Sequence, residues 1–283
     1  MSMNFAREQS LLRQRLQAVG NAATAEQHKL ALGSSATFLG ASPEAIATAA
    51  ADLVAAHPTM GRAQMTAFVR TLWQSKIHEL RAVGVELLAA RAALLEPADL
   101  PFLEGLLKDN DADPLAQRLA GEVLGAVVTR NRKLWKDLKR MAGAANDLPR
   151  RVAVRASRLP LLDDAEAFPR FAELAVPLLG LPDALLQQAI DELLAAVAPT
   201  HLDAVRAFAA QHQRTVALPK QKPAPKPAAP AVTAEPAKVV APKPAKAAPT
   251  KPAARKATAS KPKAAAKPTA KKAPAKRAGA KKA

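Results

Sequence analysis

The segment that decides the fold class is residues 62–91, RAQMTAFVRTLWQSKIHELRAVGVELLAAR. Its apolar side chains recur every three or four residues, as Met65, Phe68 and Leu72 do, and this spacing places them on one face of an α-helix. The segment therefore predicts one long helix or two abutting helices. The same spacing runs through residues 1–215, which lack both period-two alternation and runs of β-branched residues. We predict an all-α fold.

Helix-start signals divide the rest of this region into further helices. Each signal contains a polar side chain suited to the first turn, in most cases beside a proline or an acidic residue. The signals are Ser42-Pro43-Glu44, Glu96-Pro97, Asp113-Pro114, Asp147 with Pro149, Asp163-Asp164, Pro182-Asp183 and Thr200. Together they predict about eleven helices of about 10–16 residues, joined by short connections.

The predicted helices come in pairs. Residues 97–107 pair with 113–128, 130–144 with 147–159, and 163–178 with 182–197, so the pattern recurs about every 35 residues. Stacked antiparallel pairs of this length are typical of a HEAT-like helical-repeat α-solenoid. A compact helix bundle is the alternative.

The charge of the chain is concentrated at its C-terminal end. Residues 219–283 contain 16 Lys and 2 Arg against the single acid Glu235, a net charge of +17. The preceding 218 residues carry 24 basic and 23 acidic side chains, a net charge of +1. Thirteen of the 24 prolines also fall in the last 65 residues. Because this composition cannot bury a core, we predict two parts, a helical domain of residues 1–217 and a disordered tail of residues 218–283.

A flexible polycation binds nucleic acid by releasing counterions from the phosphate backbone, without sequence preference. The composition resembles the Lys/Ala/Pro-rich tails of linker histones and bacterial histone-like proteins. The tail residues expected to bind DNA are Lys256, Lys261, Lys263, Lys267, Lys271, Lys272, Lys276, Arg277, Lys281 and Lys282. The alternative is a solubilising tail, and the choice between DNA and RNA stays open.

Several classes of protein are excluded by composition. The chain has no Cys, which removes disulfides, thiolate metal sites and a Cys nucleophile, and its five His are scattered without metal-ligand spacing. No Gly-rich phosphate loop or Gly-x-Ser-x-Gly elbow is present. The sequence shows neither a signal peptide nor a spanning segment. We expect a monomeric, cytoplasmic, nucleoid-associated protein without metal or cofactor.

Four short motifs resemble the DNA alkylation repair family, which has HEAT-like repeats and whose best-known members excise cationic 3- and 7-alkylated purines. Residues 38–44, FLGASPE, resemble its early Leu-Gly-x-x-x-Pro-Glu turn, and Trp73 to Leu88 is similar to its Trp- and Glu-containing apolar helix. Residues 145–154, ANDLPRRVAV, and 185–190, LLQQAI, look like two later helix starts. The resemblance covers roughly residues 25–213.

By position, the resemblance implies that Asp113 is the catalytic carboxylate and that Arg151 contacts the DNA backbone. An anion is suited to the oxocarbenium-like state of N-glycosidic hydrolysis. Asp113-Pro114 is also a common helix start, and Asp111 takes its place if the alignment slips. The family's tryptophans are replaced by Asn110-Asp111-Ala112, Leu148 and Glu192. Trp73, Trp135, Phe168 and Phe171 are expected in the core.

The densest basic segment of the helical domain lies next to these positions. Ten basic residues are opposed within the segment only by Asp137 and Asp147: Arg130, Arg132, Lys133, Lys136, Lys139, Arg140, Arg150, Arg151, Arg155 and Arg158. We predict that all ten bind DNA, because on the concave surface of a solenoid this patch would contact phosphates without reading the base sequence. Arg151, Arg155 and Arg158 are expected on one helical face. A solvated helix face is the alternative.

Three functions remain open. The first is a DNA-binding protein related to alkylation repair proteins, which grips duplex, damaged or branched DNA through the basic groove and adds affinity through the tail. The second is an active alkylpurine DNA glycosylase that uses Asp113. The third is a helical interaction scaffold with a nucleoid-binding tail. The missing aromatic side chains favour the first over the second.

Overall fold

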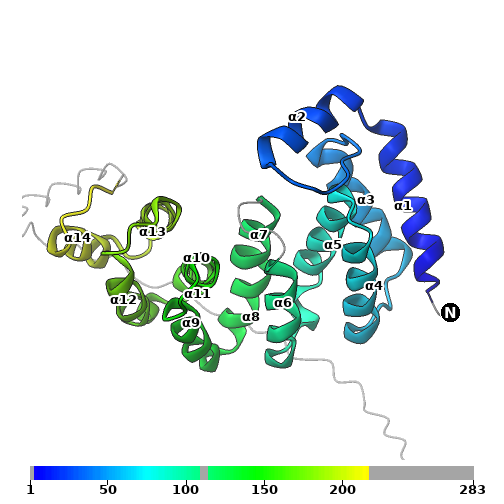
Figure 1. Cartoon of the computed structure of the whole chain (residues 1–283). Helices are drawn as coiled ribbons and strands as arrows, with labels where there is room; N and C mark the ends of the chain where they lie inside the picture. Colours follow the sequence, from blue (N-terminus) through cyan, green and yellow to red (C-terminus); the bar gives the residue numbers. More distant parts are fainter. Residues whose placement is uncertain (1–2, 109–113, 217–283) are drawn as a thin grey trace, which may run out of the picture. The chain divides into compact units, whose positions relative to one another are not determined.

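The computed structural model describes residues 3–108 and 114–216, which belong to the first of two units of the chain, Met1–Ala224. Every regular element in these residues is a helix, and the only pairing of extended backbone is an isolated bridge between Thr37 and Ile77 (Figure 1). The predicted all-α class is confirmed. Asp113 and residues 218–283, together with the predicted boundary between domain and tail, lie outside the described residues.

The N-terminal half follows the sequence signals closely. Its helices are α1 (Phe5–Val19), α2 (Ala22–Leu32), α3 (Pro43–Ala56), α4 (Arg62–Gln74), α5 (His78–Ala90) and α6 (Leu100–Leu107), with 3₁₀ turns η1 (Ala92–Leu94) and η2 (Pro97–Asp99). Ser42 caps α3 by accepting a hydrogen bond of 3.2 Å from the N–H of Ala45. The segment 62–91 forms two helices, and the chain turns between them at Lys76, whose φ is +55°.

The C-terminal half is divided more finely than predicted. Its elements are α7 (Pro114–Arg118), the π-helical turn η3 (Leu119–Leu124), α8 (Gly125–Arg130), η4 (Arg132–Leu134), α9 (Trp135–Ala142), α10 (Asp147–Ala156), α11 (Arg158–Asp163), η5 (Ala165–Ala167), α12 (Phe168–Ala175), η6 (Val176–Leu178), α13 (Ala184–Val197) and α14 (Leu202–Gln211). The helix predicted over 163–178 is flanked by 3₁₀ turns, and prolines in the first turns of α12 and η6 account for part of this division.

Neighbouring helices in the sequence pack on one another in pairs. α4 contacts α5, α9 contacts α10, and successive pairs join through contacts of α10 with α13 and of α9 with α12 (Figure 1). One continuous cluster of apolar side chains fills the space between the layers, and it includes Trp73, Trp135, Phe168 and Phe171. The expectation that these four aromatic residues belong to the core is confirmed.

The turn before α3 approaches α2 closely. Gly40 has a φ of +73°, and a Cβ at this position would lie 2.0 Å from the carbonyl oxygen of Asn21. The N–H of Asn21 donates to the carbonyl of Gly40 at 3.1 Å, and the Asn21 side chain caps α2. Only glycine satisfies both requirements, which explains the Leu-Gly pair at positions 39 and 40.

In the part of the chain that the structure describes, no helix is both long and apolar enough to cross a membrane.

Candidate nucleic-acid interface

The ten basic residues of segment 130–158 are distributed over several helices and do not form one patch. Arg130 ends α8, Arg132 and Lys133 lie in η4, and Lys136, Lys139 and Arg140 lie on α9. Arg150, Arg151 and Arg155 lie on α10, and Arg158 begins α11. The buried residues of α9 and α10 pack between these two groups, so the segment divides into an α9 group and an α10–α11 group.

The α10–α11 group borders an open cavity of about 320 Å³, here named the α7–α13 cavity. Its walls come from α7 with η3, from the junction of α10 and α11, and from α13: Gln117, Arg118, Gly121, Glu122, Arg155, Arg158, Ala189, Glu192, Leu193 and Ala196. A smaller neighbouring cavity of about 100 Å³ adds Arg151 and Leu148 and shares Gln117 and Arg155 with the first. Arg155 thus borders both cavities, Arg151 borders only the smaller one and Arg158 only the larger one. The three arginines expected on one helical face are divided between α10 and α11.

The shape of the α7–α13 cavity depends on close helix packing and a π-helical turn. Gly125 of α8 lies against the end of α10, where an added Cβ would come within 3.2 Å of the carbonyl oxygen of Ala156. The preceding turn, η3, is π-helical, and Gly121 and Glu122 of this turn face the cavity. π-helical turns often occur at functional sites because they redirect the side chains that they carry.

Arg155 is half-buried and held from two sides. Its Nη1 donates to Oε1 of Gln117 at 3.1 Å and lies 3.9 Å from Oε2 of Glu192. Burial lowers the pKa of Arg155, while Glu192 opposes this shift and neighbouring Arg151 adds to it. The guanidinium stays charged at neutral pH. Because the contact with Glu192 is long and exposed, Arg155 retains donors for an anion in the cavity.

Arg118 and Arg158 complete the cationic lining of this cavity. Arg118 forms ion pairs with Glu86 of α5 and with Glu122, the latter at 3.0 Å. Burial raises the pKa of Glu86, and Arg118 partly offsets the rise. Arg158 is exposed and has no ion pair with any described residue. Three arginines from three helices thus meet two cavity carboxylates, Glu122 and Glu192.

Other basic residues of the segment hold the fold together. Arg151 lies 3.7 Å from Asp183, which caps α13, and both side chains are largely buried. Arg150 donates to the carbonyl of Ala144 at 2.8 Å and to Asp147 at 3.0 Å. These two arginines stabilise the start of α10 and the start of α13. Their substitution would therefore destabilise the fold as well as weaken the binding of any ligand.

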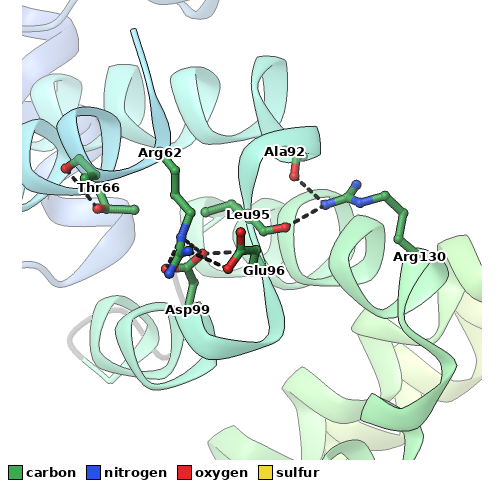
Figure 2. A network of polar contacts seen from close by, with 8 residues as sticks. Arg62, Thr66, Ala92, Leu95, Glu96, Asp99 and Arg130 are labelled. Carbon is green, nitrogen blue, oxygen red and sulfur yellow. Dashed lines mark hydrogen bonds and ion pairs between the residues drawn. The ribbon is translucent and has the colours of Figure 1, made fainter. Parts of the chain in front are cut away.

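Arg130 also serves a structural contact. Its Nη2 donates to the carbonyls of Ala92 and Leu95, the latter at 3.2 Å (Figure 2). On the other side of the same turn, Arg62 bonds Glu96 at 2.5 Å and Asp99 at 2.9 Å. Two arginines from different helices, Arg62 of α4 and Arg130 of α8, therefore stabilise the turn between α5 and α6.

The remaining cations differ in whether they have an acidic partner. Arg132 pairs with Asp164 at 3.2 Å, Lys139 with Glu173 at 3.3 Å, and Arg140 with Glu104 at 2.7 Å. These acids lie far from the cations in the sequence, so the local excess of positive charge does not reveal them. Of the ten residues, only Lys133, Lys136 and Arg158 lack both an ion pair and a hydrogen bond of their side chain with described residues.

The structure also locates two of the positions that the resemblance matched to tryptophans. Leu148 lies between the small cavity beside Arg151 and a second apolar cavity of about 100 Å³. Glu192 places a carboxylate on the wall of the α7–α13 cavity. The third position and Asp113 lie outside the described residues. No aromatic side chain lines these cavities among the described residues.

Sequence reasoning missed Gln117, Arg118 and Glu122. Their only local signal is the i,i+4 pair of Arg118 and Glu122, which is typical of any solvated helix. Their role depends on the helices of the next two repeats. Within residues 3–108 and 114–216, no group of three His, Asp or Glu side chains is placed to hold a metal ion.

Comparison with known proteins identifies relatives of this fold. The family model described as DNA alkylation repair enzyme matches residues 12–225. A solved structure described as a predicted DNA alkylation repair enzyme from Enterococcus faecalis superposes with a TM-score of 0.59 at 14% identity. The match covers 71% of this chain and 92% of that chain, and at this identity it shows the fold alone. A comparison with curated protein sequences finds no match.

Proposed function

The chain belongs to the DNA alkylation repair enzyme family, and on this premise we propose that it binds the backbone of duplex DNA, including damaged or branched DNA, at the α7–α13 cavity. The observation that carries the proposal is the meeting of Arg118, Arg155 and Arg158, from three different helices, around one open cavity. Arginine is suited to this task because its planar group donates several hydrogen bonds to phosphate oxygens.

The chemistry of the cavity favours backbone contacts over recognition of a base. A site that stacks on an alkylated base needs an aromatic wall, which contributes about 0.5–2 kcal/mol per ring to binding a cationic group. The corresponding positions hold Leu148 and Glu192. Phosphate contacts fix the position of a protein on DNA without reading its sequence. The cationic tail adds sequence-independent affinity, consistent with a cytoplasmic, nucleoid-associated protein.

The test is charge reversal at the two cavity arginines that are least engaged in the fold. In the full chain, Arg155→Glu with Arg158→Glu should lower the slope of log affinity against log salt by about 1 for each phosphate group that the variant no longer binds. A control for non-specific effects of charge is Arg206→Glu on α14, a single charge reversal outside the cavity. Circular dichroism would verify that both variants fold. Equal slopes of log affinity against log salt for the wild type and the cavity variant would show that these arginines do not bind DNA phosphates.

The second function, an alkylpurine DNA glycosylase, is supported by family membership and by Asp113. Release of 3- and 7-methylpurines from methylated duplex DNA would be measured under single-turnover conditions for the full chain and for Asp113→Asn. Release that disappears in Asp113→Asn would establish a glycosylase that works without the family's tryptophans. No release by a chain that binds the same duplex would establish DNA binding alone.

A further inference from the structure

A second cationic cavity lies on the α9 group. It has a volume of about 490 Å³ and lies between the turn that begins α6 and the η4–α9 segment. Pro97, Leu100 and Leu134 form part of its apolar lining, and Lys133 and Lys136 line it as well. We name it the α6–α9 cavity. Neither the family resemblance nor the proposed function assigns it a role.

The acidic side chains in this cavity are already engaged. Arg140 donates to Oε1 of Glu104 at 2.7 Å, and its Nε lies 3.7 Å from Oδ1 of Asp137. The hydrogen bond to Glu104 raises the pKa of Arg140. Lys133 and Lys136 are both exposed and have no ion pair with any described residue. The cavity therefore presents two ammonium groups whose charge is not neutralised by a direct partner.

This cavity and the α7–α13 cavity share no lining residue. The apolar cavity beside Leu148 shares Glu104 and Arg140 with the α6–α9 cavity, but it shares no lining residue with the α7–α13 cavity. Trp135, Leu138 and Met141 form the buried face of α9, which packs against α10, and α10 in turn contacts α13. Lys136 lies on the exposed side of α9. Because duplex DNA is stiff over about 150 base pairs, a duplex that lies along the α7–α13 cavity does not bend around these two packed helices to reach Lys136.

We infer that Lys133 and Lys136 bind the phosphates of a second DNA segment, so that one chain can bridge two duplexes. Because the two residues are spaced i,i+3, their side chains are neighbours and both reach one phosphate strand. Lysine acts there as a point charge without base preference. The chain's own tail is excluded as the occupant because it carries a net charge of +17. The inference rests on the proposed function for the first duplex.

Lysine acetylation followed by mass spectrometry tests the site in the full chain. The acetylation rate of each lysine is measured separately, so DNA binding by the tail does not mask changes in the helical domain. With saturating duplex, acetylation of Lys133 and Lys136 should slow about fivefold or more, since a bound amine reacts only while it is released. Lys29 on α2, which is exposed and outside both cavities, is the control and should react at its original rate. Unchanged rates at Lys133 and Lys136, or an equal decrease at Lys29, would overturn the inference.

Variants separate this inference from the proposed function. In Arg155→Glu with Arg158→Glu, protection of Lys133 and Lys136 should persist, and its loss would mean one continuous surface and no second site. Lys133→Gln with Lys136→Gln should reduce capture of a free duplex by an immobilised one more than it reduces binding to a single duplex, and an equal reduction of both would overturn the inference. If polyglutamate slows acetylation of the two lysines and duplex DNA does not, the ligand of this cavity is an acidic protein segment and not DNA. Suppose that Arg155→Glu with Arg158→Glu binds a single duplex as the wild type does, while DNA still protects Lys133 and Lys136 from acetylation. The proposed role of the α7–α13 cavity would then be wrong, and the two lysines would still bind DNA.

Discussion

Glu79 accepts a hydrogen bond of 2.8 Å from the backbone N–H of Gly40, and this bond ties the first turn of α5 to the turn before α3. The same oxygen, Oε1, also accepts from the N–H of Leu39 at 2.9 Å. The carboxylate is almost fully buried, and its Oε2 has no hydrogen-bond partner among the residues that the structure describes. The buried carboxylate supplies the acceptor that both N–H groups need at a position where water is excluded.

Replacing Gly40 with alanine should strongly destabilise the domain. The left-handed backbone costs about 1–2 kcal/mol for a residue with a Cβ, and the contact with Asn21 adds a steric cost of about 1–3 kcal/mol. Gly33→Ala is the matched control, because Gly33 also has a positive φ but an added Cβ meets nothing within 4 Å. Urea unfolding followed by circular dichroism measures both variants. Equal destabilisation of the two variants would show that the contact with Asn21 is unimportant.

Replacing Glu79 with alanine should cost about 2–4 kcal/mol, because the N–H groups of Leu39 and Gly40 would then have no shared acceptor. Glu79→Gln keeps one carbonyl oxygen for these bonds but removes their charge-assisted strength, so it should be less destabilising. Chemical unfolding of the two variants at the same pH gives the comparison. A glutamine variant as unstable as the alanine variant would mean that the negative charge, and not the acceptor geometry, stabilises the turn.

Local signals are sufficient to predict several of the helix starts. Ser42 caps α3, Asp183 caps α13, and Asp164 caps the turn before α12, as the sequence indicated. Such caps act within one turn of chain and are therefore visible without knowledge of the fold. The sequence does not decide between one helix and two over residues 62–91, because Lys76 is not a residue type that favours a positive φ.

The candidate site could be predicted only in part. The spacing of Arg151, Arg155 and Arg158 predicted one helical face, but the chain divides after Ala156, so that Arg151 and Arg155 lie on α10 and Arg158 lies on α11. Their acidic neighbours Asp183 and Glu192 come from the next repeat, so sequence proximity could not reveal that much of the basic charge is paired. The division of the segment between two sides of α9 and α10 likewise depends on packing between helices.

Glu86 should make the stability of the domain depend on pH. Burial raises the folded-state pKa of Glu86 above its usual value of 4.5, so the folded chain holds this proton more tightly than the unfolded chain. The resulting contribution is fully present below about pH 4.5 and is lost as the pH rises through the folded-state pKa. The difference in unfolding free energy between wild type and Glu86→Gln should therefore shift against the wild type as the pH rises. A difference that does not change with pH would contradict the raised pKa.

Deleting residues 219–283 should sharply reduce the salt dependence of DNA binding. The deletion removes 18 of the 42 basic residues, and if about 6–10 of them met phosphates, the affinity of the full chain would fall about 10³–10⁵-fold between 50 and 200 mM salt. The shortened chain should keep a weaker, shallower binding that depends on Arg155 and Arg158. Fluorescence anisotropy with one labelled duplex across this salt range measures both slopes. The same slope before and after deletion would assign the phosphate contacts to the helical domain, whereas complete loss of binding would assign them to the tail.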